Sequence, residues 1–147
     1  MKLLCILFIS VFSINAEMIS SKDNNKDRES QSIEHLVKSF STFVSKNLPI
    51  QIDSATILVS MIPLNKSILI TKSIDTNNKQ LVNIDFSPMG DMHKYMYEKD
   101  RKQSCYNKDT LYLITRGAKL MYYYEDINKK PLFKHIVQLE DCNLLNK

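Results

Sequence analysis

The sequence predicts an α+β fold in which an N-terminal helix packs on a curved antiparallel sheet of four or five strands, with a helical insert. Apolar side chains recur at helical spacing between residues 30 and 47, and several later segments alternate apolar with polar side chains. One long helix followed mainly by strands is an α+β pattern, because the helix and the sheet can bury their apolar faces against each other.

The first predicted helix spans residues 30–47. Ser30 or Ser32 can cap its start, and Pro49 ends it. A helix with this apolar stripe usually packs on a sheet; binding to a membrane surface is the alternative, but the polar face carries only two lysines. The apolar positions that follow the i, i+3, i+4, i+7 spacing are Ile33, Leu36, Val37, Phe40, Phe43, Val44 and Leu48.

Segments rich in β-branched residues or with alternating polarity predict the strands. They cover residues 50–52, 56–62, 66–74 and 81–86, and a final hairpin pairs 118–125 with 132–139. Turn-forming residues separate them, notably at 63–65 and 75–78. The side chains predicted to face inward are Ile68, Ile70 and Ile74 in one strand and Val82, Ile84 and Phe86 in the next.

A helical insert is predicted between the strands. Pro88 suits the first turn of a helix over 89–104, in which Met89, Met92 and Met96 form a narrow apolar stripe. Residues 107–116 favour a short second helix ended by Gly117, since glycine readily adopts the conformation that follows a helix.

Residues 1–16 have the three parts of an export signal: one charge at Lys2, an apolar core, and a small residue at the predicted cut after Ala16. The apolar run is shorter than the about 20 residues that span a membrane, and Cys5 lies too early for lipidation. We therefore expect an exported protein, periplasmic or extracellular, without a transmembrane anchor once the signal is removed. A polar tail over 17–29 and one α+β domain over 30–147 would follow.

Cysteine usage agrees with export. Loss of the signal removes Cys5 and leaves Cys105 and Cys142, which allow one internal disulfide in an oxidising compartment. The bridge would close a loop of about 38 residues and contribute roughly 4 kcal/mol on the chain-entropy model. Two free thiols or an intermolecular bond are the alternatives. The wide spacing favours a structural bridge over a redox-active pair.

Charge and composition disfavour several classes of binding site. The net charge is +4, with basic and acidic residues interspersed, so no nucleic-acid-binding surface is predicted. Only 2 glycines are present, which argues against glycine-rich phosphate loops and against a turn-dense barrel. The length after signal removal fits one domain.

The chain resembles a set of short exported bacterial proteins of unknown function. The shared pattern is a helix, then L-P-x-x-x-D-x-x-T-x-L at 48–58, a central cysteine at Cys105, x-x-x-G ending at Gly117, an aromatic strand ending at Asp126, and a final Asp141-Cys142. Ile114 replaces the usual leucine before Gly117, and nothing in the pattern matches residues 75–89. The resemblance implies a cystatin-like helix-on-sheet fold but no activity, because the inhibitory Gln-x-Val-x-Gly loop of cystatins is absent.

Residues for catalysis or metal binding are sparse. No G-x-S-x-G motif is present, and the three histidines, His35, His93 and His135, are interpreted as ordinary surface or partly buried residues. Asp91 and His93 lack further metal ligands nearby in sequence. We therefore predict no catalytic, metal or cofactor site. A cleft that holds His93 or His135 against a carboxylate would instead favour an enzyme.

Tyrosines mark the candidate partner surface. Residues 122–124 are all tyrosine, and alternation along a strand sends Tyr123 to the face opposite its neighbours. The plain interpretation is a core face with one exposed ring; the functional one is a protein-binding patch of Tyr123 with Tyr95 and Tyr97.

The sequence thus favours an exported, non-enzymatic protein-binding or assembly module of the bacterial envelope, as an accessory of a secretion or pilus-like system. The alternatives are a small secreted enzyme or effector acting on an envelope polymer, and an inhibitor of a foreign enzyme.

Overall fold

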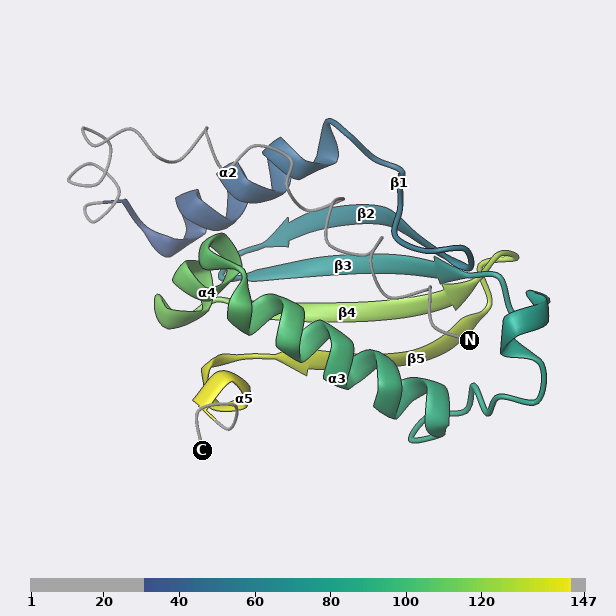
Figure 1. Ribbon diagram of the computed structural model, residues 1–147. Coiled ribbons are helices and arrows are strands. Elements are labelled where there is room, and N and C mark those ends of the chain that lie inside the picture. Colours follow the sequence, from purple (N-terminus) through teal and green to yellow (C-terminus); the bar gives the residue numbers. More distant parts are fainter. Residues whose placement is uncertain (1–30, 144–147) are drawn as a thin grey trace, which may run out of the picture. The chain divides into compact units, whose positions relative to one another are not determined.

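The computed structural model describes residues 31–143 (Figure 1). The predicted signal peptide (1–16) and tail (17–29) lie outside these residues. The described elements are α2 (Ile33–Ser45), β1 (Ile50–Gln51), β2 (Thr56–Leu64), β3 (Ser67–Ile74), the 3-10 helix η3 (Lys79–Leu81), α3 (Asp91–Tyr106), α4 (Lys108–Thr115), β4 (Lys119–Asp126), β5 (Pro131–Val137) and α5 (Leu139–Asn143).

The strands form one sheet in the sequential order β1-β2-β3-β4-β5. The pairs β1–β2, β2–β3 and β4–β5 are antiparallel, but β3 and β4 are parallel. A parallel neighbour requires a crossover connection, and α3 and α4 lie within it. The α+β prediction is confirmed, with the correction that the sheet is mixed rather than purely antiparallel.

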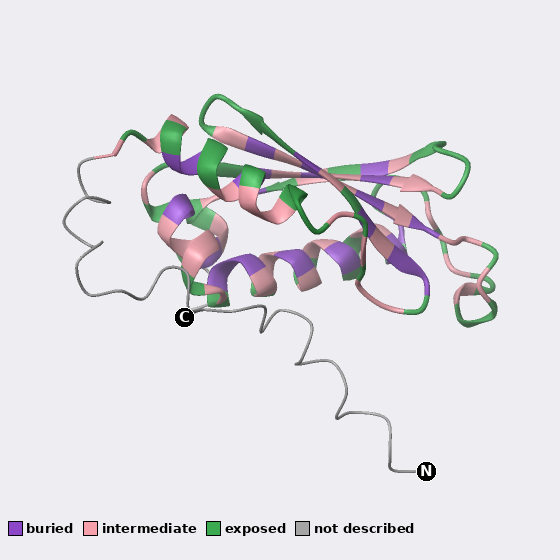
Figure 2. Cartoon of the chain, turned by 90° about the horizontal axis from the view of Figure 1, so that it is seen from above, coloured by how far each residue is buried: buried purple, intermediate pink, exposed green. Residues whose placement is uncertain are grey.

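Three helices cover one face of the sheet. Inward side chains of β2 to β5 and buried side chains of α2, α3 and α4 belong to a single core cluster. Figure 2 shows the buried side of α3 turned toward the strands. Helix α2 begins after Ser32, whose side chain accepts a hydrogen bond from the backbone N–H of His35 at 3.3 Å, and it buries Leu36 and Val37. Burying one face against a sheet is what its apolar periodicity predicts.

The strand predicted over 81–86 is wrong. Leu81 ends η3, Asn83 takes a left-handed conformation with φ of 66°, and Val82, predicted to face inward, is 64% exposed. Leu81, Ile84 and Phe86 instead pack as single side chains against the core. Alternation alone cannot show whether a neighbouring strand is available, and β4 already occupies the free side of β3.

Helix α3 begins two residues later than predicted, and its apolar stripe is shorter. Met92 and Met96 are buried, but Met89 is 70% exposed. Gly90 precedes the helix where the chain passes close to itself: a Cβ there would lie 2.8 Å from the carbonyl oxygen of Asp85. The backbone of Met92 donates to that same carbonyl at 3.1 Å, so the close approach fixes where α3 starts.

Candidate functional site

A buried polar cluster lies between α3 and the sheet, formed by Lys72, Asp100, Tyr124 and His135. Lys72 occupies an inward position of β3 that alternation would give to an apolar residue, and Tyr124 lies beside it on β4. Asp100 comes from α3, one turn after Met96 on the same side, and its side chain is 0% exposed. Four elements therefore contribute to one buried site.

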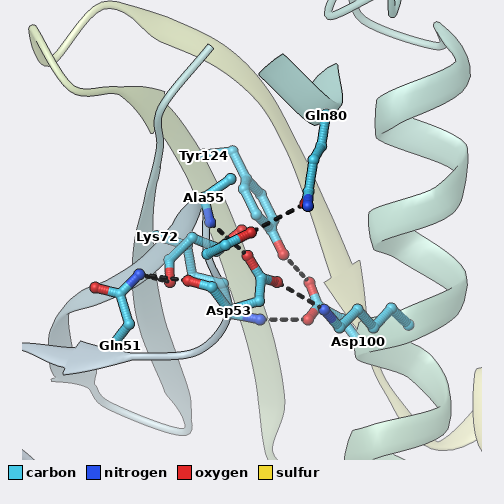
Figure 3. Close-up of polar contacts among 10 residues, drawn as sticks. Gln51, Asp53, Ala55, Lys72, Gln80, Asp100 and Tyr124 are labelled. Atoms are coloured by element: carbon cyan, nitrogen blue, oxygen red, sulfur yellow. Dashed lines mark hydrogen bonds and ion pairs between the residues drawn. The ribbon is translucent and has the colours of Figure 1, made fainter. Parts of the chain in front are cut away.

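Asp100 is the centre of this polar cluster. Its Oδ1 accepts a hydrogen bond and ion pair from the Lys72 ammonium, and its Oδ2 accepts the Tyr124 hydroxyl at 2.6 Å. Figure 3 shows Lys72 and Tyr124 reaching the carboxylate from neighbouring strands. The Nε2 atom of His135 lies 3.0 Å from the same Oδ2. Both carboxylate oxygens are thus occupied by protein donors.

The surroundings fix the charge of the polar cluster. Burial alone would raise the pKa of Asp100, but the Lys72 ammonium and the hydrogen bonds from His135, Lys72 and Tyr124 outweigh it, so this pKa lies below its ordinary value. Burial and the adjacent Asp100 charge raise the pKa of Tyr124 well above its ordinary value. Asp100 therefore stays ionised and Tyr124 stays a neutral donor.

Aromatic rings close the polar cluster on its remaining sides. His135 stacks on His93, with ring centroids 5.5 Å apart, and Tyr97 meets its ring edge-on at 5.4 Å. The Lys72 ammonium lies 4.8 Å from the centre of the Tyr122 ring, whose hydroxyl is 2.7 Å from the Ser104 hydroxyl. These contacts leave little room for a substrate around Asp100.

This packing decides what the polar cluster can do chemically. A histidine against a carboxylate is an arrangement that acid–base catalysis uses, and the sequence alone did not bring His135 and Asp100 together. Here, however, Asp100 is fully buried and the His135 side chain is 6% exposed. A general base must reach its substrate, so this geometry is suited to fixing α3 on the sheet rather than to turnover.

A second set of polar contacts, beside the polar cluster, holds α3 to the turn between β1 and β2. The Lys99 ammonium pairs with Asp53 Oδ2 at 3.0 Å, and Asp53 Oδ1 accepts the backbone N–H of Ala55 at 3.0 Å (Figure 3). Burial alone would raise the pKa of Asp53, but the Lys99 hydrogen bond and charge and the Ala55 N–H lower it. Asp53 is part of the sequence pattern, within its motif at 48–58, and in the structure it shapes a turn and anchors α3.

The other two aspartates of that pattern have similar structural roles. Asp126 accepts the backbone N–H groups of Asn128 and Lys130 in the β4–β5 turn. Asp141 accepts the Tyr97 hydroxyl at 2.6 Å, and the neighbouring Cys142 is joined to Cys105 by a disulfide. The residues of the pattern therefore stabilise turns and contacts between elements, and they do not form a reactive centre.

The opposite face of the sheet carries the exposed apolar side chains of the strands. Ile62 of β2 pairs with Leu69 of β3, Leu69 with Met121 of β4, and Met121 with Ile136 of β5. These four residues form an apolar row across the sheet at one register. Ile62 and Ile136 are 46% and 45% exposed, and neither Leu69 nor Met121 packs against the core cluster. Among the described residues, no helix covers this open face.

The three predicted partner tyrosines do not come together. Tyr123 lies on the open face of the sheet, directly opposite Thr71 and Lys134. Tyr95 lies on α3, on the helical side of the molecule, and is 60% exposed. Tyr97 is held inward: burial and the hydrogen bond to Asp141 raise its pKa to about 12. Only Tyr123 joins an apolar surface.

Comparison of the fold with solved structures finds close matches. A pilotin of the type II secretion system of Vibrio vulnificus superposes with a TM-score of 0.64 and 11% identity, over 80% of this chain and 94% of the pilotin. The type II secretion system pilotin of Vibrio cholerae matches with a TM-score of 0.62 and 14% identity, over 83% and 100% of the two chains. The chain shares its fold with these two structures.

A third solved structure shares the fold. A candidate secreted protein of Pseudomonas aeruginosa matches the chain with a TM-score of 0.62 and 14% identity, over 80% of this chain and 96% of that one. No family model and no curated protein matches the sequence. Within residues 31–143, none of the helices combines the length and the apolar character needed to cross a membrane.

Two signals in the sequence could have revealed the polar cluster. Asp100 follows Met92 and Met96 at spacings of four, which places it on the buried side of α3. Lys72 follows Ile68 and Ile70 at spacings of two, which places it on the inner face of β3. Opposite charges on two buried faces indicate an ion pair, but only the crossover topology shows that the two faces meet.

Proposed function

We propose that this chain is an exported, non-enzymatic accessory of a bacterial secretion system, which acts by binding another protein during assembly. The observation that carries the proposal is the fold, since two type II secretion pilotins match almost over their whole length. Because a fold by itself hosts different functions, the proposal also draws on the site.

Two features of the site support binding over turnover. Both oxygens of the buried carboxylate Asp100 already have a protein donor, and the side chain of His135 beside it is only 6% exposed. The open face of the sheet, in contrast, carries an apolar row across four strands, and its two outer members, Ile62 and Ile136, are exposed. Apolar side chains at the centre of a surface are typical of protein interfaces.

Deletion of the gene, followed by measurement of a secreted enzyme in the medium and in the periplasm, tests the proposal. We expect the enzyme to accumulate in the periplasm and to return to the medium when the wild-type chain is restored. Normal secretion in the deletion strain would contradict the proposal.

A second measurement separates binding from turnover. The purified chain, incubated with isolated cell-wall glycan, should release no product above the level seen with heat-denatured chain. Release that is lost in His93→Gln but kept in Tyr95→Ala would favour the enzyme instead, because His93 stacks on the polar cluster and Tyr95 does not touch it.

A further inference from the structure

We infer that the open face of the sheet binds an apolar segment of a partner protein whose flanks carry acidic residues. The inference rests on the proposed function and adds to it the surface and the chemistry of the partner.

The apolar row supplies the contact area. Neighbouring strands lie about 4.8 Å apart, so four paired residues extend over about 14 Å. Ile62, Leu69, Met121 and Ile136 occupy these four positions at one register, with the two outer ones most exposed. Covering such a row removes apolar surface from water, which is the main favourable contribution to protein association.

Lysines set the charge around the row. Lys119 precedes Met121 by two positions on β4, and Lys134 precedes Ile136 by two positions on β5, so both lie on the open face. Both are exposed, and neither forms an ion pair within residues 31–143. Glu125, further along β4, is the acidic residue of this face in the described strands.

This charge pattern favours an acidic partner segment over a second copy of the chain. A second copy of the chain would present the same face, which carries two exposed lysines and one glutamate in the described strands, and a like net charge on both sides of an interface opposes binding. A segment with carboxylates beside its apolar side chains would place opposite charges next to Lys119 and Lys134. Tyr123, opposite Lys134, adds a ring with both apolar and hydrogen-bonding surface, the kind of residue that interfaces favour.

Site-specific photo-crosslinking in living cells tests the inference. The photoreactive residue p-benzoylphenylalanine replaces Ile62 or Ile136 on the open face, or Tyr95 on the helical side as a matched exposed control. Mass spectrometry then identifies the crosslinked peptide. We expect adducts from positions 62 and 136, none from position 95, and a captured apolar peptide bounded by aspartate or glutamate.

The lysines are tested by charge reversal. Combined Lys119→Glu and Lys134→Glu substitutions should reduce the yield of the adduct several-fold, whereas Lys102→Glu with Lys108→Glu, an equal change of charge on the exposed side of α3 and α4, should leave it unchanged. Both variants must retain the wild-type unfolding temperature, which shows that the fold is intact.

Several outcomes would overturn the inference. They are no adduct at positions 62 and 136, an adduct with a second copy or with the chain's own residues, an adduct with lipid, or a captured peptide without acidic flanks. A secretion component captured from position 95 alone would overturn this surface and leave the proposed function standing. Normal secretion after gene deletion, together with specific capture at positions 62 and 136, would overturn the proposed function and leave the binding surface standing.

Discussion

Helices α2 and α3 cover the same face of the sheet, but different chemistry holds them there. Helix α2 buries Leu36 and Val37, with Phe40 and Val44 partly buried against the core. Helix α3 buries Met92 and Met96 in its first half, then Asp100 and Ser104 further along. The second half of α3 is therefore held by hydrogen bonds and an ion pair. Helix α2 is held mainly by apolar contact, although it also buries Ser41 and donates one hydrogen bond from Ser45 to the Met61 carbonyl.

This difference sets how each helix responds to change. Apolar contacts weaken in proportion to the surface or volume removed and depend little on pH. A buried ion pair depends on both partners, because a charge left alone in the core is very unfavourable. We therefore expect α3 to be sensitive to single polar substitutions and to acid, and α2 to respond mainly to loss of apolar volume.

Removal of the Asp100 carboxylate should have the largest effect. Asp100→Ala leaves the Lys72 ammonium buried without its partner and should lower the free energy of unfolding by about 3–5 kcal/mol. Leu36→Ala in α2 removes only apolar volume, at a cost of about 2–5 kcal/mol. Urea unfolding of both variants at several pH values checks this, since only the Asp100 variant should change the pH dependence.

A double substitution provides the control. Lys72→Met with Asp100→Leu replaces both charges by apolar groups and should recover part of the loss, because no unpaired charge remains. Recovery stays incomplete, since Tyr124 and His135 still lose their acceptor. If the double variant is less stable than Asp100→Ala, an uncompensated Lys72 is not the cause, and the contrast with α2 fails.

The disulfide should give the next largest effect. Cys105 lies at the end of α3 and Cys142 in α5, and the bond spans a sequence separation of 37. Cys105→Ala with Cys142→Ala should lower the free energy of unfolding by about 2–4 kcal/mol, mainly because the unfolded chain gains freedom. Thermal unfolding of the oxidised wild type, the reduced wild type and the double variant measures it; equal stability of all three would contradict the expectation.

Much of the fold is predictable because its signals are local. The stripe of α2 repeats within the helix itself, and the β4–β5 hairpin combines two alternating segments with a turn held by Asp126. Gly117 follows the C-cap residue Arg116 of α4 and takes a φ of 93°, as its position after a predicted helix indicates. Such features require no knowledge of distant residues.

The site is less predictable because it depends on topology. Lys72 and Asp100 meet only because β4 returns parallel to β3 after the α3–α4 crossover, and no local pattern encodes that pairing. Because β4 pairs with β3, residues 81–86 have no neighbouring strand with which to pair. They are therefore not a strand, although their side chains alternate as in one. The apolar row likewise appears only once the registers of four strands are known.

Loss of a single donor should have a smaller effect than loss of the carboxylate. Tyr124→Phe removes the hydroxyl 2.6 Å from Asp100 and keeps the buried ring. A hydrogen bond to a charged group contributes about 1.5–3 kcal/mol, so the free energy of unfolding should fall by that amount. Tyr123→Phe on the open face serves as the matched control, and chemical denaturation should show it close to wild type.

Mild acid should give the smallest effect, and it should act on α3. Burial first, then the neighbouring His135, lower the pKa of His93, against a weaker opposing effect of its hydrogen bond with the Lys134 backbone. The His93 Nδ1 atom also accepts the Met89 backbone N–H at 2.9 Å, which requires an unprotonated nitrogen. The folded state therefore favours neutral His93 more than the unfolded state does.

The sign of the pH dependence follows from that lowered pKa. Above the ordinary histidine pKa of about 6.5, His93 is neutral in both states and its contribution is fully present. As the pH falls below that value the unfolded chain takes up the proton first, so stability declines until the pH passes the lower pKa of the folded state. Unfolding measured between pH 7.5 and 4.5 should show this decline in the wild type and a flatter profile in His93→Gln. Identical profiles would mean that the His93 stack is indifferent to protonation. The acid sensitivity of α3 would then rest on Asp100 and on Asp53, the partner of Lys99, whose lowered pKa values confine their effect to more acidic solution.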